Sequence, residues 1–426
     1  MLSRRLLRIK AVKALYSHFK SESDSLIVSE KNLMLSIDKT YELYHQMLWL
    51  VVEVANYAEN RIELGRRKHL PTPEELNPNT KFVDNRVVAA LRESDALTDY
   101  LQRKKLGWVQ APELVKKLYH AMVESDYYRK YMDAPARSFK EDVRLVESFY
   151  TRTVGESEAL EEALEVTRIH SAAGTLAADA GVMAERPFRA PHHTVSAVAL
   201  SGGGSFPRPG EISLSHNGVL FLDELPEFHK DVLEALRQPL EDGEVTITRA
   251  SGTLRLPSRF MLVCAMNPCR CGWRGHPSGR CTCSAREVER YVEKISGPLL
   301  DRIDLHVSVP AVEYASMRRK ETPESSADVK CRVDAARAVQ TARFAGTGVT
   351  CNAHMTAPMI GQFCCLDHAG DALMKSAFER MGLTARSHDR ILRVARTIAD
   401  LDGAADIRPE HLAEAIQFRN TDILKG

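Results

Sequence analysis

The chain has 426 residues, enough for two or three domains with their own hydrophobic cores. Its 58 basic and 57 acidic side chains leave a net charge of +1, which excludes binding to polyanions through overall charge alone. The apolar fraction of 44% is that of an ordinary globular protein, and no apolar run is long enough to span a membrane.

The start of the chain and its cysteines both bear on the compartment. The segment MLSRRLLRIKAVKALY is basic but has no continuous apolar stretch and no small-residue cleavage site, so we expect no signal peptide. All nine cysteines lie at or after Cys264, and four of them fall within residues 269–283. This crowding favours a reducing compartment and a metal or thiol cluster over a disulfide framework. We therefore expect a cytoplasmic protein.

Residues 1–154 contain only two glycines, and their apolar periodicity predicts helix almost throughout. The predicted helices span residues 2–19, 30–64, 82–105, 111–132 and 138–152, with a loop at 71–78. In the first helix the apolar residues recur at steps of three and four, which leaves a basic set largely on the other faces. This set consists of Arg4, Arg5, Arg8 and Lys10.

The strings RRLLRIKAVKALYSH and FKEDVRLVESFYTRTV resemble the N-terminal part of NusB, an RNA-binding transcription antitermination protein. The resemblance covers about the first 150 residues and implies a partial all-α bundle, because the remaining helices of that family do not follow. It also implies that Arg4, Arg5, Arg8 and Lys10 contact RNA phosphates. A solvated basic face explains the same residues equally well.

Residues 219–223, VLFLD, predict a strand buried on both faces of a parallel sheet. Asp223 and Glu224 then emerge at its carboxyl end, the edge at which open α/β sheets bind ligands. Two adjacent carboxylates there suit a Mg²⁺-nucleotide site, in which one holds the hydrated metal and the other orients or deprotonates water. Capping of a helix that begins near Glu227 is the alternative reading of the same pair.

The segments LEEALEVTRIHSAAG and RPFRAPHHTVSAVALSGGGSFPRPGEISLSHNGVLFLDELPEF closely resemble the ComM/YifB family of magnesium-chelatase-like AAA+ ATPases. The resemblance runs from about residue 160 to the last helix, and it implies an ATP-binding α/β core with a C-terminal helical lid. It also implies that the glycine-rich turn at 202–204 is an insert facing a central pore and DNA. His192 and His193 could be ligands, but a structural or exposed pair is the more frequent use of such residues.

The segment that follows predicts a helix at 230–240 and then a β-hairpin, EVTITRASGTLRLP. The family places such a hairpin toward nucleic acid, where Arg249 and Arg255 would meet phosphates. An exposed hairpin with ordinary surface arginines is the alternative.

Three further residues receive roles from the resemblance. Asn267, at the end of the strand RFMLVCAMNP, matches the sensor-1 asparagine that positions water against the γ-phosphate. Arg302 in SGPLLDRIDLHVSVP matches the arginine finger, which reaches the ATP of a neighbouring subunit and therefore implies a homo-oligomeric ring. Arg386 matches the sensor-2 arginine of the lid. The alternatives are a turn residue, a local ion pair and a surface residue, respectively.

The string CRCGWRGHPSGRCTC has the spacing C-x-C-x9-C-x-C. Four thiolates separated by glycine and proline can surround a tetrahedral Zn²⁺, and no open ligand position is evident, so the site would be structural. Free thiols in a loop are the alternative. The four residues are Cys269, Cys271, Cys281 and Cys283.

The phosphate-binding loop G-x-x-x-x-G-K-[ST] of the family is missing before LEEALEVTRIH, where FYTRTVGESEA stands instead. Without that cradle and its lysine we expect nucleotide affinity to fall steeply and hydrolysis to be doubtful. The Lon-like N-terminal domain of the family has no counterpart either. We hypothesise a chimera, from gene rearrangement or sequence assembly, with its junction at residues 158–165.

The expected fold is therefore an α/β AAA+ core, truncated at its first strand, with a helical lid and an all-α N-terminal part. The expected domains are residues 1–157, 158–312 (core), 313–347 (connection) and 348–426 (lid). The leading function is a ComM/YifB-type ATPase module that uses ATP and Mg²⁺ and associates with DNA, through Asp223, Glu224, Asn267, Arg302 and Arg386. An RNA-binding antitermination factor and a non-functional fusion are the alternatives.

Overall fold

A computed structural model of the chain describes residues 4–20, 25–135, 137–176, 181–204, 208–249, 252–276, 278–310 and 324–419. The contacts within it divide the chain into two units. The first unit comprises Met1–Ala190, Ala197–Leu220 and Asp242–Met261, and the second comprises Pro191–Ser196, Phe221–Glu241 and Leu262–Gly426.

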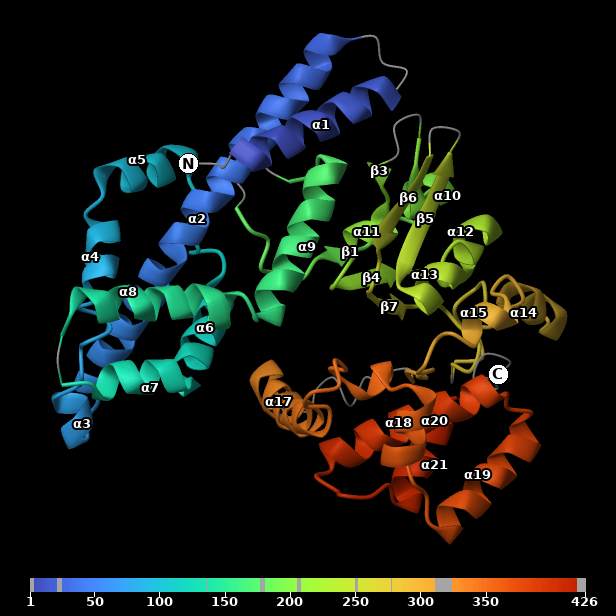
Figure 1. Ribbon diagram of the computed structural model, residues 1–426. Coiled ribbons are helices and arrows are strands. Elements are labelled where there is room, and N and C mark those ends of the chain that lie inside the picture. Colours follow the sequence, from blue (N-terminus) through green and yellow to red (C-terminus); the bar gives the residue numbers. More distant parts are fainter. Residues whose placement is uncertain are drawn as a thin grey trace. The chain divides into compact units, whose positions relative to one another are not determined.

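The N-terminal part of the first unit is helical, as predicted, and none of the described helices of the chain is both long and apolar enough to cross a membrane. Its longest helix, α2, contacts α1, α4, α5 and α6 along its length (Figure 1). The helices are α1 (Arg4–Lys20), α2 (Leu26–Arg66), α3 (Pro73–Leu76), α4 (Arg86–Arg92), α5 (Asp95–Lys104), α6 (Pro112–Glu124), α7 (Asp126–Asp133), α8 (Phe139–Ser148), the π-helix η1 (Phe149–Val154) and α9 (Glu158–Ala173).

The N-terminal helices differ from the predicted ones in three places. The segment 111–132 is divided at Ser125, whose hydroxyl accepts from the N–H of Tyr128 and caps α7. The segment 82–105 is divided at Glu93 and Ser94. The predicted loop at 71–78 contains α3, because Thr72 and Glu75 form a capping box there.

The first unit has a hydrophobic core in which helix α9 takes part together with the preceding helices. Leu160 and Ala163 of α9 belong to the same cluster of buried side chains as Leu50 of α2 and Leu118 of α6. Its fully buried large side chains include Phe82, Trp108, Met122 and Phe149. Helix α9 therefore completes the core of the N-terminal helices, although its sequence resembles the ATPase family.

The predicted parallel sheet is present and small. Its strand order is β1 (Phe188–Arg189), β4 (Val219–Leu222) and β7 (Met261–Cys264), with β1 parallel to β4. The Met261 N–H donates to the Gly218 carbonyl and the Ala265 N–H to that of Leu222. These bonds advance by four residues along both strands, which is the parallel pattern.

Strand β4 corresponds to the predicted strand but is only partly enclosed. Leu220 and Leu222 are fully buried, whereas Val219 and Phe221 are half-buried, so one face is more accessible than the sequence indicates. The predicted hairpin is confirmed: β5 (Glu244–Arg249) pairs antiparallel with β6 (Gly252–Pro257). Short elements complete this region: α10 (Ala197–Ser201), β2 (Gly202–Gly203), β3 (Arg208–Pro209) and α11 (Glu211–Leu214).

The helix predicted at 230–240 is wrong as a single element, because it is divided into α12 (Lys230–Glu234) and α13 (Arg237–Asp242). Pro239 lies inside α13 and has no N–H, and its ring would clash with the carbonyl four residues earlier, at Ala235, in a continuous helix. The helix is therefore interrupted at Ala235, between α12 and α13. Further elements of the second unit are η2 (Leu225–Glu227), α14 (Ala285–Val292) and α15 (Gly297–Leu300).

The C-terminal part of the second unit is a group of helices with its own core (Figure 1). Helix α20 contributes an apolar stripe to this core: Ile391, Leu392, Ala395 and Ala399 are buried. The helices are α17 (Ser326–Arg343), η3 (Asn352–His354), α18 (Ala357–Phe363), α19 (His368–Met381), α20 (Ala385–Leu401) and α21 (Pro409–Gln417).

A buried carboxylate, Asp400, joins these C-terminal helices. Its oxygens accept from Arg343 Nη1 at 2.7 Å, from Asn352 Nδ2 at 2.8 Å and from Arg396 Nε at 3.1 Å. Burial by itself would raise the pKa of Asp400, but the donors from Arg343 and Asn352 outweigh it and lower that pKa. The carboxylate is therefore ionised and fully paired, which links α17, η3 and α20.

We predict that Leu160→Ala lowers the free energy of unfolding of the first unit by about 2–5 kcal/mol, because it leaves a cavity in a shared core. Hydrogen exchange should accelerate in α2 and α6 as well as in α9. Leu70→Ala, at an 87% exposed leucine, is the matched control and should change stability by less than about 0.5 kcal/mol. Faster exchange confined to residues 158–173 would contradict the shared core.

We predict that Asp400→Asn destabilises the C-terminal helices by about 3–5 kcal/mol, because it leaves buried Arg396 and largely buried Arg343 without their counter-charge. Urea unfolding followed by circular dichroism measures the change. Asp406→Asn, at an exposed position of the same helical group, is the control. Equal midpoints for the two variants would show that the network contributes nothing to stability.

Candidate functional site

Strand β4 holds Asp223 and Glu224 at its carboxyl end, within the second unit. The Ala265 N–H donates to the Leu222 carbonyl and the Leu225 N–H donates to the Ala265 carbonyl, so the backbone is fixed on both sides of the acidic pair. Glu224 has φ +54° and ψ 47°, a left-handed conformation that few non-glycine residues adopt. Both carboxylates are exposed.

The helix-capping alternative for this pair does not describe what the side chains do. Glu224 occupies the N-cap position of η2, but its carboxylate makes no capping hydrogen bond. The Asp223 carboxylate instead accepts from the N–H of Glu224 at 2.9 Å, which holds the unusual backbone turn. Neither side chain therefore caps η2, and both remain exposed to solvent.

His193 is a neighbour of Glu224 that sequence reasoning missed. Its Nδ1 lies 3.2 Å from a carboxylate oxygen of Glu224, and its ring packs against that of His192 with centroids 4.0 Å apart. We expected a structural or exposed pair. The available signal was topological: the two histidines follow β1, which pairs with β4, so they leave the sheet beside the acidic pair.

Asn267 follows β7, the strand on the other side of β4. Parallel neighbours end at the same edge of a sheet, so Asn267 emerges at the edge that carries Asp223. Its side chain is exposed, and Gly272 lies against it: a Cβ at that glycine would be 3.9 Å from the Asn267 Cγ. Gly272 has φ +77°, so this close turn favours glycine.

Arg302 and Arg386 meet on one carboxylate, that of Glu241. Arg302 Nη2 donates to Glu241 Oε2, and Arg386 Nη2 lies 2.8 Å from Glu241 Oε1. Arg302 is 10% exposed in its side chain and Arg386 is 63% exposed. Glu241 was not singled out in the sequence, where LEDGEV reads only as the end of a helix.

The predicted catalytic residues thus fall into two groups. Asp223, Glu224 and Asn267 share the edge of the sheet, whereas Arg302 and Arg386 share Glu241. Across the described ranges no hydrogen bond or ion pair joins the two groups, so their convergence on one triphosphate stays a prediction. A cavity of about 90 Å³ does form in the first unit, lined by residues of α6 and α9, and no predicted site residue lines it.

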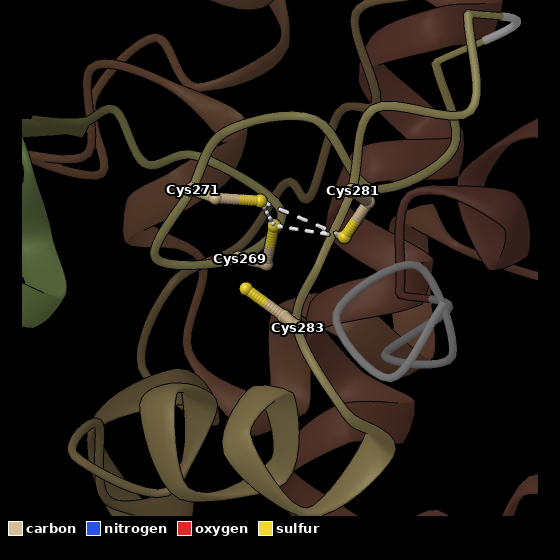
Figure 2. Close-up of side chains that lie close together, drawn as sticks. All are labelled: Cys269, Cys271, Cys281 and Cys283. Atoms are coloured by element: carbon tan, nitrogen blue, oxygen red, sulfur yellow. Dashed lines mark hydrogen bonds between the residues drawn. The ribbon is translucent and has the colours of Figure 1, made fainter.

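The four cysteines do come together. Figure 2 shows Cys269, Cys271 and Cys281 pointing toward one another, with Cys283 beside them. The Sγ–Sγ distances are 3.3 Å between Cys269 and Cys271, 3.8 Å between Cys269 and Cys281, and 3.6 Å between Cys271 and Cys281. All four sulfurs lie within 4.8 Å of one another.

This spacing suits a tetrahedral ion. A Zn–S bond of about 2.3 Å places ligand sulfurs roughly 3.8 Å apart. The Trp273 backbone and the Cys269 thiol lower the pKa of Cys271 to about 6, so one thiolate is available before any metal binds. The pair Cys281 and Cys283 directly precedes α14, which a capping box from Ser284 and Glu287 anchors.

The candidate nucleic-acid residues differ in their availability. Arg5, Arg8 and Arg255 are exposed. Lys10 is half-buried and donates to Ser36 Oγ at 2.6 Å, and burial, with the charge of Lys13, lowers its pKa. Lys10 therefore ties α1 to α2. The side chains of Arg4 and Arg249 lie outside the described part of the chain.

Comparison with known proteins bears on the assignment of this region. Residues 154–317 match the family model described as magnesium chelatase, subunit ChlI, and residues 323–419 match that of magnesium chelatase, subunit ChlI C-terminal. The first match begins close to the predicted junction. Together the two matches extend over the sheet, the cysteine cluster and the C-terminal helices.

Individual relatives agree with the family models. The chain is 46% identical to the competence protein ComM of Haemophilus influenzae over 236 residues, which is 55% of this chain and 45% of that protein. It is 44% identical to YifB of Escherichia coli over 241 residues, 56% of this chain and 46% of that protein. A more distant relative is the maternal DNA replication licensing factor mcm6 of Xenopus tropicalis, 23% identical over 227 residues, which is 51% of this chain and 26% of that protein.

The chain spans about half the length of the curated relatives ComM and YifB. The two segments that match the family models contain the acidic pair, Asn267, the four cysteines and both arginines. From residue 154 to residue 419, this chain belongs to the magnesium-chelatase-like family that includes ComM and YifB.

Proposed function

We propose that residues 158–426 act as a ComM/YifB-type ATPase module that binds a Mg²⁺-nucleotide at the carboxyl edge of the β1-β4-β7 sheet. The observation that carries the proposal is the placement of Asp223 and Glu224 at the end of β4, beside the end of β7 with Asn267. Two carboxylates and an amide at neighbouring parallel strand ends match the chemistry of a hydrated Mg²⁺ and an attacking water.

Each residue has a distinct role in this proposal. Asp223 holds the hydration shell of Mg²⁺, whose charge neutralises the phosphates when it is bound. Glu224 orients the attacking water and accepts its proton, and His193 holds that carboxylate in place. Asn267 donates its amide to the same water or to the γ-phosphate. Arg302 and Arg386 supply positive charge to the phosphates.

The arginines favour an assembly of several copies. Arg302 and Arg386 belong to a different group from the acidic pair, and an arginine that serves a neighbour's nucleotide would be placed apart from its own site. We propose a homo-oligomeric ring that acts on DNA, consistent with a distant relative named as a DNA replication factor. The pore loop at 202–204 and Arg255 are the proposed DNA contacts.

The chain lacks the pattern G-x-x-x-x-G-K-[ST], so its affinity for nucleotide depends on the groups named above. We propose weak binding of Mg-ATP, with a Kd in the roughly millimolar range, because the backbone cradle for the phosphates contributes much of the affinity in related sites. Turnover would be correspondingly slow.

We also propose that Cys269, Cys271, Cys281 and Cys283 bind a structural Zn²⁺. The support is their sulfur spacing together with the complete burial of Cys269. Four thiolates leave no open coordination position, so the ion would anchor the loop between β7 and α14 and take no part in hydrolysis.

RNA binding by residues 1–157, as in a NusB-like antitermination factor, remains the second proposal. The exposed Arg5 and Arg8 support it. The engagement of Lys10 with Ser36 weakens it, since a lysine bound to another helix is less available to a phosphate. We therefore rank it below the ATPase module.

We predict that the wild-type chain binds ATP more tightly with Mg²⁺ than without it, and that Asp223→Asn removes this difference because it removes the carboxylate nearest the metal. Glu224→Gln should retain the Mg²⁺ dependence, since its role is with water. Isothermal titration at nucleotide concentrations up to roughly ten times the expected Kd measures both. Asp231→Asn, at an exposed aspartate on α12, is the control.

If neither the wild type nor any variant binds ATP at those concentrations, the proposal that residues 158–426 bind a nucleotide is wrong. Unchanged Mg²⁺ dependence in Asp223→Asn would show that the metal is held elsewhere.

For the cysteine cluster we predict one Zn²⁺ per chain in protein purified without chelator, measured by inductively coupled plasma mass spectrometry. Cys281→Ser should lose the ion and lower the melting temperature, because structural zinc contributes directly to folding free energy. Cys331→Ser, at an exposed cysteine of α17, should retain it. A wild-type chain without metal, as stable after chelation as before, would refute the site.

A further inference from the structure

Glu241 is placed unusually among the charged residues of the second unit. It lies in the last turn of α13, and each of its two carboxylate oxygens pairs with a different guanidinium. The carboxylate therefore sits between Arg302 and Arg386 as a single bridging anion. It is 42% exposed in its side chain, so solvent and solutes reach it.

The arginines around Glu241 provide N–H donors and positive charge that can bind an anion. Arg302 is 10% exposed, its Nη1 donates to the Pro298 carbonyl at 2.7 Å, and its Nε is buried without a hydrogen-bond partner in the described part of the chain. Two more arginines lie nearby and have their own partners: Arg390 with Asp304, and Arg419 with Asp301. These four guanidiniums pair with three carboxylates, because Glu241 is shared by two of them.

Glu241 is the only carboxylate that the described ion pairs assign to Arg302 or Arg386. The hydrogen bond from Arg302, followed by the charges of Arg302 and Arg386, lowers the pKa of Glu241. Removing its charge would leave both guanidiniums without a counter-anion. A guanidinium donates to carboxylate and phosphate oxygens through the same N–H groups, so a phosphate chain could replace the carboxylate.

We propose that Glu241 occupies the place of an oligophosphate group between Arg302 and Arg386, and that it sets the affinity of this site by competing with that group. The inference rests on the proposed function in assigning these two arginines to phosphates, and it adds the residue that opposes the ligand. Glu241 differs from Asp400 in its exposure to solvent. The carboxylate of Asp400 is 1% exposed and shielded, whereas Glu241 can be displaced without opening the core.

The competition has a direct consequence. While Glu241 bridges the arginines, an incoming polyanion must displace one carboxylate, and the two binding events are coupled reciprocally. Once displaced, Glu241 is exposed enough to be hydrated. A chain with an uncharged residue at position 241 would hold the same donors but offer them to the ligand without that competitor.

The test uses sodium tripolyphosphate without Mg²⁺ or adenosine, titrated calorimetrically into the full chain. We expect Glu241→Gln to bind tripolyphosphate about tenfold more tightly than the wild type, because the amide keeps the shape of the side chain and removes its charge. Adding Arg386→Ala to that variant should abolish the gain. Glu244→Gln, at an exposed glutamate three residues later, should bind like the wild type.

Equal or weaker binding by Glu241→Gln, or no binding by either protein, would overturn the proposal. If Glu241→Gln does not fold, as judged by circular dichroism, Glu241→Asp replaces it. The shorter side chain cannot reach both arginines, so we again expect tighter binding of tripolyphosphate. Unchanged binding would again overturn the proposal. The probe contains neither adenosine nor metal, so failure of Mg-ATP binding at Asp223 and failure of this inference are separate outcomes.

Discussion

The backbone hydrogen bonds of β4 are the constraint on which the rest of the site depends. This strand lies between β1 and β7. The Gly218 carbonyl accepts from the Met261 N–H, and the Val219 N–H donates to the Pro187 carbonyl. Leu220 and Leu222 have no exposure, so a shift by one residue would bury polar groups and expose both leucines. With the register held, Asp223 and Glu224 can emerge only at the carboxyl edge.

Helix α9 gives the first unit its continuity. Its apolar side chains enter the core of the N-terminal helices, while its polar ones bind the segment before β4: His170 Nε2 lies 3.0 Å from the Leu214 carbonyl, and His216 Nε2 lies 3.1 Å from Glu165. A junction at residues 158–165 would therefore lie within a helix that contacts both sides. The N-terminal helices and the family-matched segment are packed together here, whatever their origin.

Arginine–carboxylate contacts are used in two different ways in the second unit. Around Asp400 every oxygen is satisfied and shielded, and removal of one partner leaves buried charge, which is the behaviour of a structural network. Around Glu241 the carboxylate and Arg386 are both accessible to solvent. An accessible bridge between two cations costs little to open, and that property suits a site through which an anion must enter.

Local patterns in the sequence determined much of this protein. Apolar periodicity predicted the helical N-terminal part and the β-hairpin, because each depends on residues close in the chain. Four cysteines in fifteen positions predicted their own cluster for the same reason. Only the tertiary structure could decide where α9 packs, that His193 reaches Glu224, and that Arg302 and Arg386 share Glu241. These contacts join residues up to 145 positions apart, as Glu241 and Arg386 are, and no local pattern encodes which distant side chains a fold brings within hydrogen-bond distance.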